Sequence, residues 1–340
     1  MKNSTASELK NRCSLLRVRL FLLWFMASFG TLAIAALPQW QPVDSVEFVV
    51  GAGPGGGNDN IARKIQKILQ DKKLVVSPIN VVNKPGGGGA ISLSYLSQRA
   101  GMGNFISISS NTILTNHITR KSPLNYTDLT PISILINEYI SFNVKPDSPI
   151  KTGKDLVAKL QTDPGSIVVG ISTSLGNINH IAFATVARAV GADPKKAKVV
   201  VFSSSGASIT ALMGGHVDLV VGPTSIAATH LASGNLRAIA VTSPKRRIGV
   251  FSAIPTWKEL EVDAIVDNWR GLIGPKDMTA AQIAYWDMAL GKMFKTDEWK
   301  KEVDASYWDN AGKNSKETEQ YLRVQYDAIK HELIELGFVK

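Results

Sequence analysis

Three features of this 340-residue chain predict an α/β fold built from parallel strand–helix units. Between residues 46 and 241, short apolar runs alternate with segments whose apolar residues recur at helical spacing. Polar turns rich in glycine or serine follow several of these runs. The length and the hydrophobic fraction of 44% suit a globular protein with room for two domains.

The N-terminus is expected to be a secretory signal peptide spanning residues 1–35. Three arginines precede an apolar run over 20–36, which ends in small residues just before Pro38. An uncleaved anchor is the alternative, but this run is shorter than the roughly 20 residues that span a bilayer. We expect cleavage near Ala35 or Ala36. Cys13, the only cysteine, would leave with the peptide, so the mature chain would hold no disulfide.

The mature chain is expected to stay basic. Residues 1–35 hold five basic residues and one acid, so their removal lowers the net charge from +10 to +6. The remaining lysines and arginines are scattered among acids and are not clustered with aromatic residues. This pattern indicates a solvated surface that mildly attracts anions, and it argues against a nucleic-acid partner.

The expected strands and helices alternate along the chain. Strands are expected at 46–50, 79–82, 105–109, 167–171, 199–202, 217–221 and 236–242. Two of the intervening helices show clear apolar stripes, one over 61–69 and one over 178–189 that ends before Gly191.

The last eighty residues are expected to form helices and are rich in aromatic residues. Thr279 with Gln282, and Asn314 with Glu317, have the spacing of capping boxes at two helix starts. The segment 115–155 is rich in Pro, Asn, Ser and Thr and is the expected crossing between domains.

The most informative stretch is 46–60, where an apolar strand runs into a glycine turn and then an amphipathic helix. Gly55, Gly56 and Gly57 lack a Cβ, so their backbone N–H groups can converge beside a helix N-terminus and bind an anion. A dinucleotide fingerprint over 51–56 is the rival interpretation. However, the next strand ends in Asn83-Lys-Pro rather than an acid, and no Walker lysine follows the glycines.

Three further turns link a strand to a helix, at 83–90, 172–180 and 203–208. Each alone is explained by ordinary turn and capping chemistry. Together they indicate a cleft, because open α/β sheets bind ligands outside the carboxyl ends of their strands. If the first two turns face the last two, helix N-termini on both walls suit a small molecule with a carboxylate at each end.

Two side chains in these turns are open to more than one interpretation. Asp59 either complements the helix dipole or holds a water or a ligand amino group. His180 is expected to support its turn by hydrogen bonding, because no nucleophile or second base has suitable spacing. No Gly-x-Ser-x-Gly motif and no histidine pair with metal-ligand spacing occurs in the sequence. We therefore predict no catalytic residue, no metal site, no cofactor and no enzymatic activity.

Several segments, in order, resemble the periplasmic solute-binding proteins of tripartite tricarboxylate transporters, also called the Bug family. Gly53-Pro-Gly-Gly-Gly-Asn-Asp59 and Asn83-Lys-Pro-Gly-Gly-Gly-Gly89 resemble the first two landmarks of that family, and Gly176 to His180 resembles a turn ending in histidine. The later landmarks are at 212–219, 236–243, 254–256 and 269–275. The resemblance covers nearly the whole mature chain.

The resemblance implies a type II periplasmic-binding-protein-like fold, with two lobes that close like a flytrap on a small organic acid. Lobe I would comprise 36–125 and 240–340, lobe II would comprise 126–239, and strands near 132–144 and 236–241 would act as hinge. The implied ligand-binding residues are Gly55, Gly56, Gly57, Asn58, Asp59, Ser174, Gly176, Asn177, His180, Ser204 and Ser205. Asn177, Ile178 and Gly222 depart from residues that many relatives carry, so the identity of the ligand does not transfer.

The expected function is therefore that of a monomeric, periplasmic binding protein. It would deliver a di- or tricarboxylate, an aromatic acid or an amino acid to the membrane permease subunits of a tripartite tricarboxylate-type transporter. Two alternatives stay open: a dinucleotide-dependent oxidoreductase, and a ligand sensor that signals to another protein on the same fold.

Overall fold

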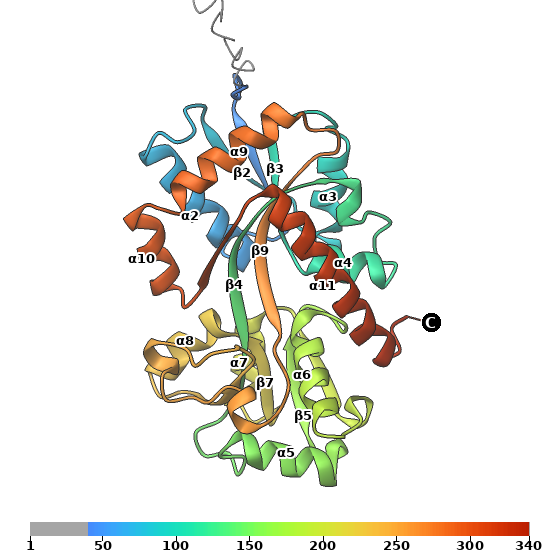
Figure 1. Cartoon of the computed structure of the whole chain (residues 1–340). Helices are drawn as coiled ribbons and strands as arrows, with labels where there is room; N and C mark the ends of the chain where they lie inside the picture. The colour runs from blue at the N-terminus through green and yellow to red at the C-terminus, as the bar shows by residue number, and fades with distance from the viewer. Residues whose placement is uncertain (1–39, 340) are drawn as a thin grey trace, which may run out of the picture. The chain divides into compact units, whose positions relative to one another are not determined.

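The longest strand, β4 (Thr130–Val144), joins the two halves of a mixed sheet (Figure 1). The computed structural model describes residues 40–339, so the expected signal peptide and Cys13 lie outside the described residues. Residues 130–139 of β4 pair with β9 (Asp267–Gly274), and residues 140–144 pair with β7 (Leu219–Pro223) and β8 (Arg237–Val241). All of these pairings are antiparallel.

Each half of the sheet has a parallel part, as the sequence predicts. In the first half, β1 (Val46–Val50) pairs with β2 (Ile79–Asn83) and β3 (Phe105–Ser110). In the second, β5 (Val168–Ser172) pairs with β6 (Lys198–Phe202) and β7. The full order is β2-β1-β3-β9-β4-β7-β5-β6, and β8 and β10 (Asp309–Lys313) also pair with β4. The predicted α/β fold class is confirmed.

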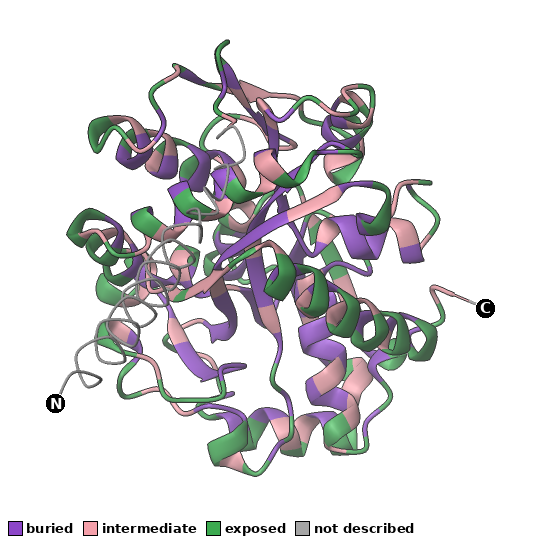
Figure 2. Ribbon diagram, turned by 45° about the horizontal axis from the view of Figure 1, so that its top comes forward, coloured by how far each residue is buried: buried purple, intermediate pink, exposed green. Residues whose placement is uncertain are grey.

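Helices follow the strands and turn one apolar face toward the sheet (Figure 2). In chain order they are α2 (Gly57–Asp71), α3 (Ala90–Ser97), α4 (Thr112–Ile118), α5 (Gly153–Thr162), α6 (Ile178–Ala189), α7 (Ser205–Met213), α8 (Thr224–Ala232), α9 (Ala280–Met293), α10 (Asp297–Ala305) and α11 (Ser315–Glu335). No helix within residues 40–339 is both long and apolar enough to cross a membrane.

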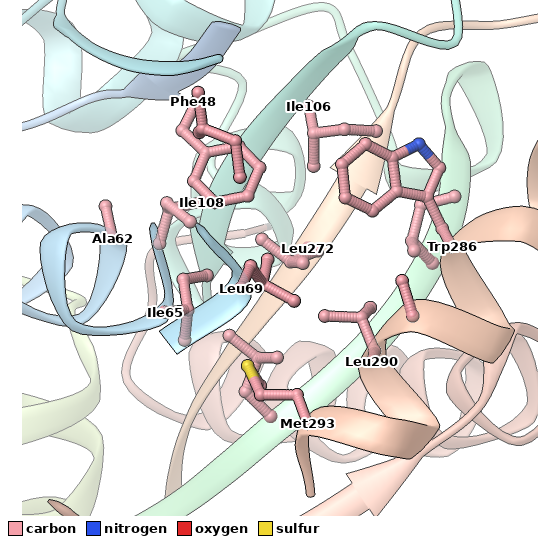
Figure 3. Packing of buried hydrophobic residues seen from close by; sticks show 14 of the residues in the cluster. Phe48, Ala62, Ile65, Leu69, Ile106, Ile108, Leu272, Trp286, Leu290 and Met293 are labelled. Carbon is pink, nitrogen blue, oxygen red and sulfur yellow. The ribbon is translucent and has the colours of Figure 1, made fainter. Parts of the chain in front are cut away.

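One apolar core lies between the first half of the sheet and helices α2 and α9 (Figure 3). Phe48 of β1 packs with Ile65 and Leu69 of α2, and Trp286 and Leu290 contribute from α9. Burial of such side chains contributes about 1.5–3 kcal/mol each. This core fixes the start of α2 relative to the end of β1.

A second core lies under the other half of the sheet. Phe142 of β4 packs edge-on against Trp257, with ring centroids 5.0 Å apart, and Phe183 of α6 joins them. The same cluster contains Val262 and Val266. These residues belong to a segment that the sequence-based division assigns to lobe I, and that division stays a prediction.

The C-terminal helix α11 contacts elements of both halves. Leu322 and Leu333 share an apolar cluster with Leu114 of α4 and with Ile181 of α6. At the surface, the guanidinium of Arg188 on α6 lies 2.5 Å from the Glu332 carboxylate of α11. The start of α6 is therefore packed against the end of the chain.

Most of the early strands lie within two residues of the ranges expected from the sequence, but β9 and β10 were not expected. The last eighty residues were expected to be helical, whereas β9 carries Arg270 and two glycines, and β10 reads Asp-Asn-Ala-Gly-Lys. Neither segment shows the alternation of apolar and polar residues that would predict a strand. Each is a strand because it pairs with β4. The capping boxes at Thr279 and Asn314 are confirmed.

Candidate functional site

A cavity of ≈ 1030 Å³ opens where the carboxyl ends of the strands from both halves of the sheet meet. All four of the predicted turns contribute to its lining. Of the residues predicted to bind ligand, those that line it are Gly55, Gly56, Gly57, Asn58, Ser174, Asn177, Ser204 and Ser205. Asp59, Gly176 and His180 are not among the lining residues in the described part of the chain.

The first glycine turn uses two of its three predicted amides internally. The N–H of Gly55, a residue with φ of 78°, donates to Asp59 Oδ2 at 2.8 Å, and the N–H of Gly56 donates to Gly53 O at 3.1 Å. The N–H groups of Gly57 and Asn58, at the start of α2, have no acceptor within residues 40–339. These two amides are therefore the ones that can hold an anion.

Asp59 is buried behind this turn and braces it. Its Oδ2 also accepts from Arg63 Nε at 3.0 Å, and its Oδ1 accepts from Asn83 Nδ2 at 2.9 Å. Burial raises the pKa of Asp59, but the hydrogen bonds from Arg63, Asn83 and Gly55 outweigh burial, so the pKa lies below its ordinary value. These contacts give Asp59 a role that neither interpretation drawn from the sequence named, that of a carboxylate that fixes the turn.

The second glycine turn lies directly against the first. A Cβ on Gly51 would lie 2.8 Å from Gly89 Cα and 2.5 Å from Ser92 Oγ, closer than a methyl group tolerates. Asn116 Nδ2 holds this second turn by donating to Gly87 O at 3.2 Å and to Gly88 O at 3.1 Å. Glycine at 51 is thus required by a close approach of two backbones.

The third turn is built around Asn177, the N-cap of α6. Its Oδ1 accepts from the His180 N–H at 3.0 Å, and its Nδ2 donates to Thr173 Oγ1 at 2.9 Å and to the carbonyl of Ser172. The amides of Ile178 and Asn179 have no acceptor among the residues described. Like the start of α2, the start of α6 offers unpaired donors at the cavity wall.

His180 supports this turn from behind. Its Nδ1 accepts from the Gly176 N–H at 3.0 Å, and its ring meets Phe338 edge-on with centroids 5.7 Å apart. Burial lowers the pKa of His180 to about 4, so its imidazole is neutral at pH 7 and can accept this hydrogen bond. The contacts match the supporting role predicted for His180 and do not bring its ring to the cavity.

The fourth turn is capped by Ser204, whose Oγ accepts from the Ala207 N–H at 3.1 Å. Ser205 Oγ lies 3.1 Å from Ser172 Oγ, which ties the third and fourth turns together. The amides of Ser205 and Gly206, at the start of α7, have no acceptor in the described chain. Three helix N-termini with unpaired donors therefore line one cavity.

The cavity lining also contains a charged pair that was not predicted from the sequence, Arg270 of β9 and Glu138 of β4. Arg270 Nη2 lies 3.8 Å from Glu138 Oε2, and Glu138 Oε1 accepts from the Ser225 N–H at 3.0 Å. Burial raises the pKa of Glu138 and the charge of Arg270 opposes that rise, while burial lowers the pKa of Arg270. Arginine within an otherwise apolar segment, Trp269-Arg-Gly-Leu-Ile, was a usable signal for this pair.

Within residues 40–339, no three or more His, Cys, Asp or Glu side chains are grouped so that they could hold a metal ion. The chemistry on offer is hydrogen-bond donation from backbone amides, hydroxyls and one buried guanidinium, which suits an anionic organic solute.

Comparison with known sequences identifies the family. Residues 61–336 match the model of the family described as the tripartite tricarboxylate transporter family receptor, TctC. The protein BugT of Bordetella pertussis is similar to this chain, at 26% identity over 257 residues, covering 74% of this chain and 76% of BugT.

Solved structures share the fold. MatC from Rhodopseudomonas palustris with bound malate superposes with a TM-score of 0.74 at 19% identity, covering 86% of this chain and 99% of MatC. An R. palustris protein with adipate superposes with a TM-score of 0.77 at 20% identity, covering 87% of this chain and 98% of that one. These likenesses establish the periplasmic binding protein fold.

Proposed function

The chain belongs to the tripartite tricarboxylate transporter receptor family, and from this premise we propose that it captures a small carboxylate-bearing solute in the cavity. The class includes di- and tricarboxylates, aromatic acids and amino acids. The captured solute is then delivered to the membrane permease subunits of a tripartite tricarboxylate-type transporter. The protein works as a monomer, without a cofactor.

The observation that carries this proposal is the convergence of helix starts on one cavity. The unpaired amides at Gly57 and Asn58 of α2, and at Ser205 and Gly206 of α7, come from opposite halves of the sheet. Helix N-termini favour negative charge by about 0.3–1 kcal/mol each at exposed sites and by more where the site is buried. The malate and adipate in the two structures of similar fold support the same class of ligand.

Export to the periplasm is part of this proposal. It is supported by the periplasmic binding protein fold and by the leader-like sequence over residues 1–35, which lie outside the described part of the chain. Because the chain belongs to a family of transporter receptors, we no longer retain the dinucleotide-dependent oxidoreductase as an alternative. Signalling to a sensor protein stays open, and permease genes beside this one would favour transport.

We also propose that the two halves close on the ligand about β4, as expected from the sequence, and about the return of the chain to β9. The return to β9 replaces the expected strand at 236–241, because that strand pairs with β4 in the second half of the sheet. β4 is shared by both halves, and β9 begins after a segment that packs in the second core. Such crossing strands are where a two-lobed protein absorbs a hinge rotation.

A thermal-shift screen across small organic acids tests the function. An acid present at 100 times its Kd stabilises the folded protein by about 2.7 kcal/mol, so we expect a clear rise in Tm with at least one carboxylate and none with its amide or ester. Small-angle scattering on the same samples is expected to show a smaller radius of gyration with that acid. A screen in which every carboxylate is silent would contradict the proposal, and unchanged scattering with a bound acid would contradict closure.

A further inference from the structure

The pair formed by Arg270 and Glu138 in the cavity lining is incompletely matched. Arg270 Nη1 donates to Asn268 Oδ1 at 2.6 Å and to Trp269 O at 3.0 Å, so one side of the guanidinium is held by its own strand. Nη2 has only the Glu138 carboxylate, at 3.8 Å, which is beyond hydrogen-bond distance. Arg270 therefore keeps donors that no acceptor within residues 40–339 satisfies.

The open side of Arg270 faces the start of α2. A Cβ on Gly57 would lie 3.6 Å from Arg270 Nη2, an ordinary contact distance, so the guanidinium lies next to the first residue of the helix. The unpaired N–H groups of Gly57 and Asn58 and the Nη2 donors thus share one region of the cavity. A carboxylate with two oxygens matches this arrangement of amides and guanidinium.

The same lining also carries acceptors that need a donor. Glu138 is 3% exposed and lines the cavity, and its two oxygens accept from the Ser225 N–H, from the Ser225 side chain and, at a long 3.4 Å, from Asn268 Nδ2, which leaves acceptor capacity on the carboxylate. Asn111 is 2% exposed, and its Nδ2 donates to Asp267 O, which fixes the orientation of its amide. Its Oδ1 therefore faces no donor in the described chain.

We propose that Arg270 and Glu138 determine which acid binds: Arg270 and the α2 amides hold one carboxylate, and Glu138 requires a hydroxyl or amino donor beside that carboxylate. This inference rests on the proposed function and names the class of ligand at the same site, a 2-hydroxy or 2-amino carboxylic acid. A second negative group next to the bound carboxylate is repelled by Glu138. Asn111 Oδ1 offers a further acceptor for the same donor.

Calorimetric titration with acids matched in carbon chain tests the inference. The probes are succinate, malate and aspartate, together with adipate and 2-aminoadipate. In each set we expect the substituted acid to bind at least about tenfold more tightly than the unsubstituted one, because only the former satisfies the buried acceptors. Comparing malate with aspartate tells whether the donor is a hydroxyl or an ammonium group.

Three variants assign the effect to the two residues. Arg270→Gln is expected to weaken binding of every acid by about tenfold or more, and Arg270→Lys, which keeps the charge but loses the planar fork, by less. Glu138→Gln keeps an oxygen for the Ser225 N–H but removes the charge, so discrimination between malate and succinate should fall. Arg323→Gln on the exposed face of α11 is the matched control and should bind like the parent protein.

The outcomes are decisive for the inference. Unchanged affinity in Arg270→Gln would overturn the inference. Unchanged affinity in a folded Arg270→Lys would also overturn it if the parent protein binds succinate and malate equally. A parent protein that binds other acids but neither malate, aspartate nor 2-aminoadipate would also overturn it while leaving the proposed function intact. A parent that binds no acid at all removes the proposed function itself. Circular dichroism of each variant shows whether a loss of binding reflects a loss of fold.

Discussion

At the scale of single residues, several polar side chains near the cavity hold backbone in place. Three side chains accept hydrogen bonds from backbone N–H groups: Asp59 from Gly55, Asn177 from His180, and His180 from Gly176. Each satisfies a donor that would otherwise compete for ligand or stay unpaired, at a net gain of about 0.5–1.5 kcal/mol for a neutral hydrogen bond. The amides left over are those of the helix starts. Side chains therefore fix the turns, and the remaining backbone amides can hold a solute.

His180 predicts a pH dependence of stability. Its pKa is lowered by burial to about 4 from an ordinary 6.5, so between these values the unfolded chain binds a proton that the folded chain excludes. Stability is then fully present above pH 6.5 and falls as pH drops toward 4, by about 3 kcal/mol over the whole window.

Urea unfolding at pH 7.5 and pH 5, for the parent and for His180→Gln, measures this contribution. Glutamine retains an oxygen that can accept from Gly176 but does not titrate. The variant should lose less stability between the two pH values than the parent does, and equal losses would show that His180 is not the responsible group.

At the scale of elements, the start of α2 depends on a short polar network rather than on an N-cap side chain. Its N-cap is Gly56, which has no side chain to offer, and the network of Asp59, Arg63 and Asn83 fixes the preceding turn instead. The adjacent turn at Gly87–Gly89 is held by Asn116 of α4. The position of the α2 amides is thus set by Asp59, Arg63 and Asn83, none of which lines the cavity in the described part of the chain.

Asp59→Asn tests this dependence. The substitution keeps the size of the side chain but removes the charge that accepts from Gly55 and Arg63, so we expect stability to fall by about 1–3 kcal/mol. Affinity for the acid found in the screen should fall by roughly tenfold, because the Gly57 and Asn58 amides lose their fixed position. Calorimetry and urea unfolding measure the two effects.

Asp71→Asn, at the far end of the same helix, is the control for Asp59→Asn. Asp71 forms an exposed ion pair with Lys67 and lies away from the cavity lining. Its replacement should change neither affinity nor stability appreciably. If Asp59→Asn behaves like this control, the network does not position the amides.

At the scale of the whole molecule, the two halves of the sheet contribute opposite walls of one cavity. β4 belongs to both halves, and α11 packs against α4 of one and α6 of the other. A solute bound between α2 and α7 would therefore connect both halves through its own hydrogen bonds. This is how ligand binding can favour a closed arrangement over an open one.

The sequence predicts the parallel parts of the fold and the turns of the site well, because both rest on local patterns. Apolar runs and glycine turns mark β1 and β5 and the starts of the helices after them. β9 and β10 escaped prediction because their strand conformation comes from pairing with β4, more than a hundred residues away along the chain. For the same reason Arg270 and Glu138 were missed, since the antiparallel pairing of β9 with β4 brings them together. The hydrogen bonds that the Gly55 and Gly56 N–H groups donate within the turn could not be predicted from the sequence either.

We expect the bound acid to reach the first amides of α2 and those of α7 at the same time, from opposite sides of the cavity. Nuclear magnetic resonance of ¹⁵N-labelled protein, with the acid that raises Tm most, tests it directly. We expect the amide signals of Gly57, Asn58, Ser205 and Gly206 all to move on saturation, whereas that of Gly55, already bonded to Asp59, should move less. A bound acid that leaves either the Gly57 and Asn58 signals or the Ser205 and Gly206 signals unmoved would contradict this arrangement.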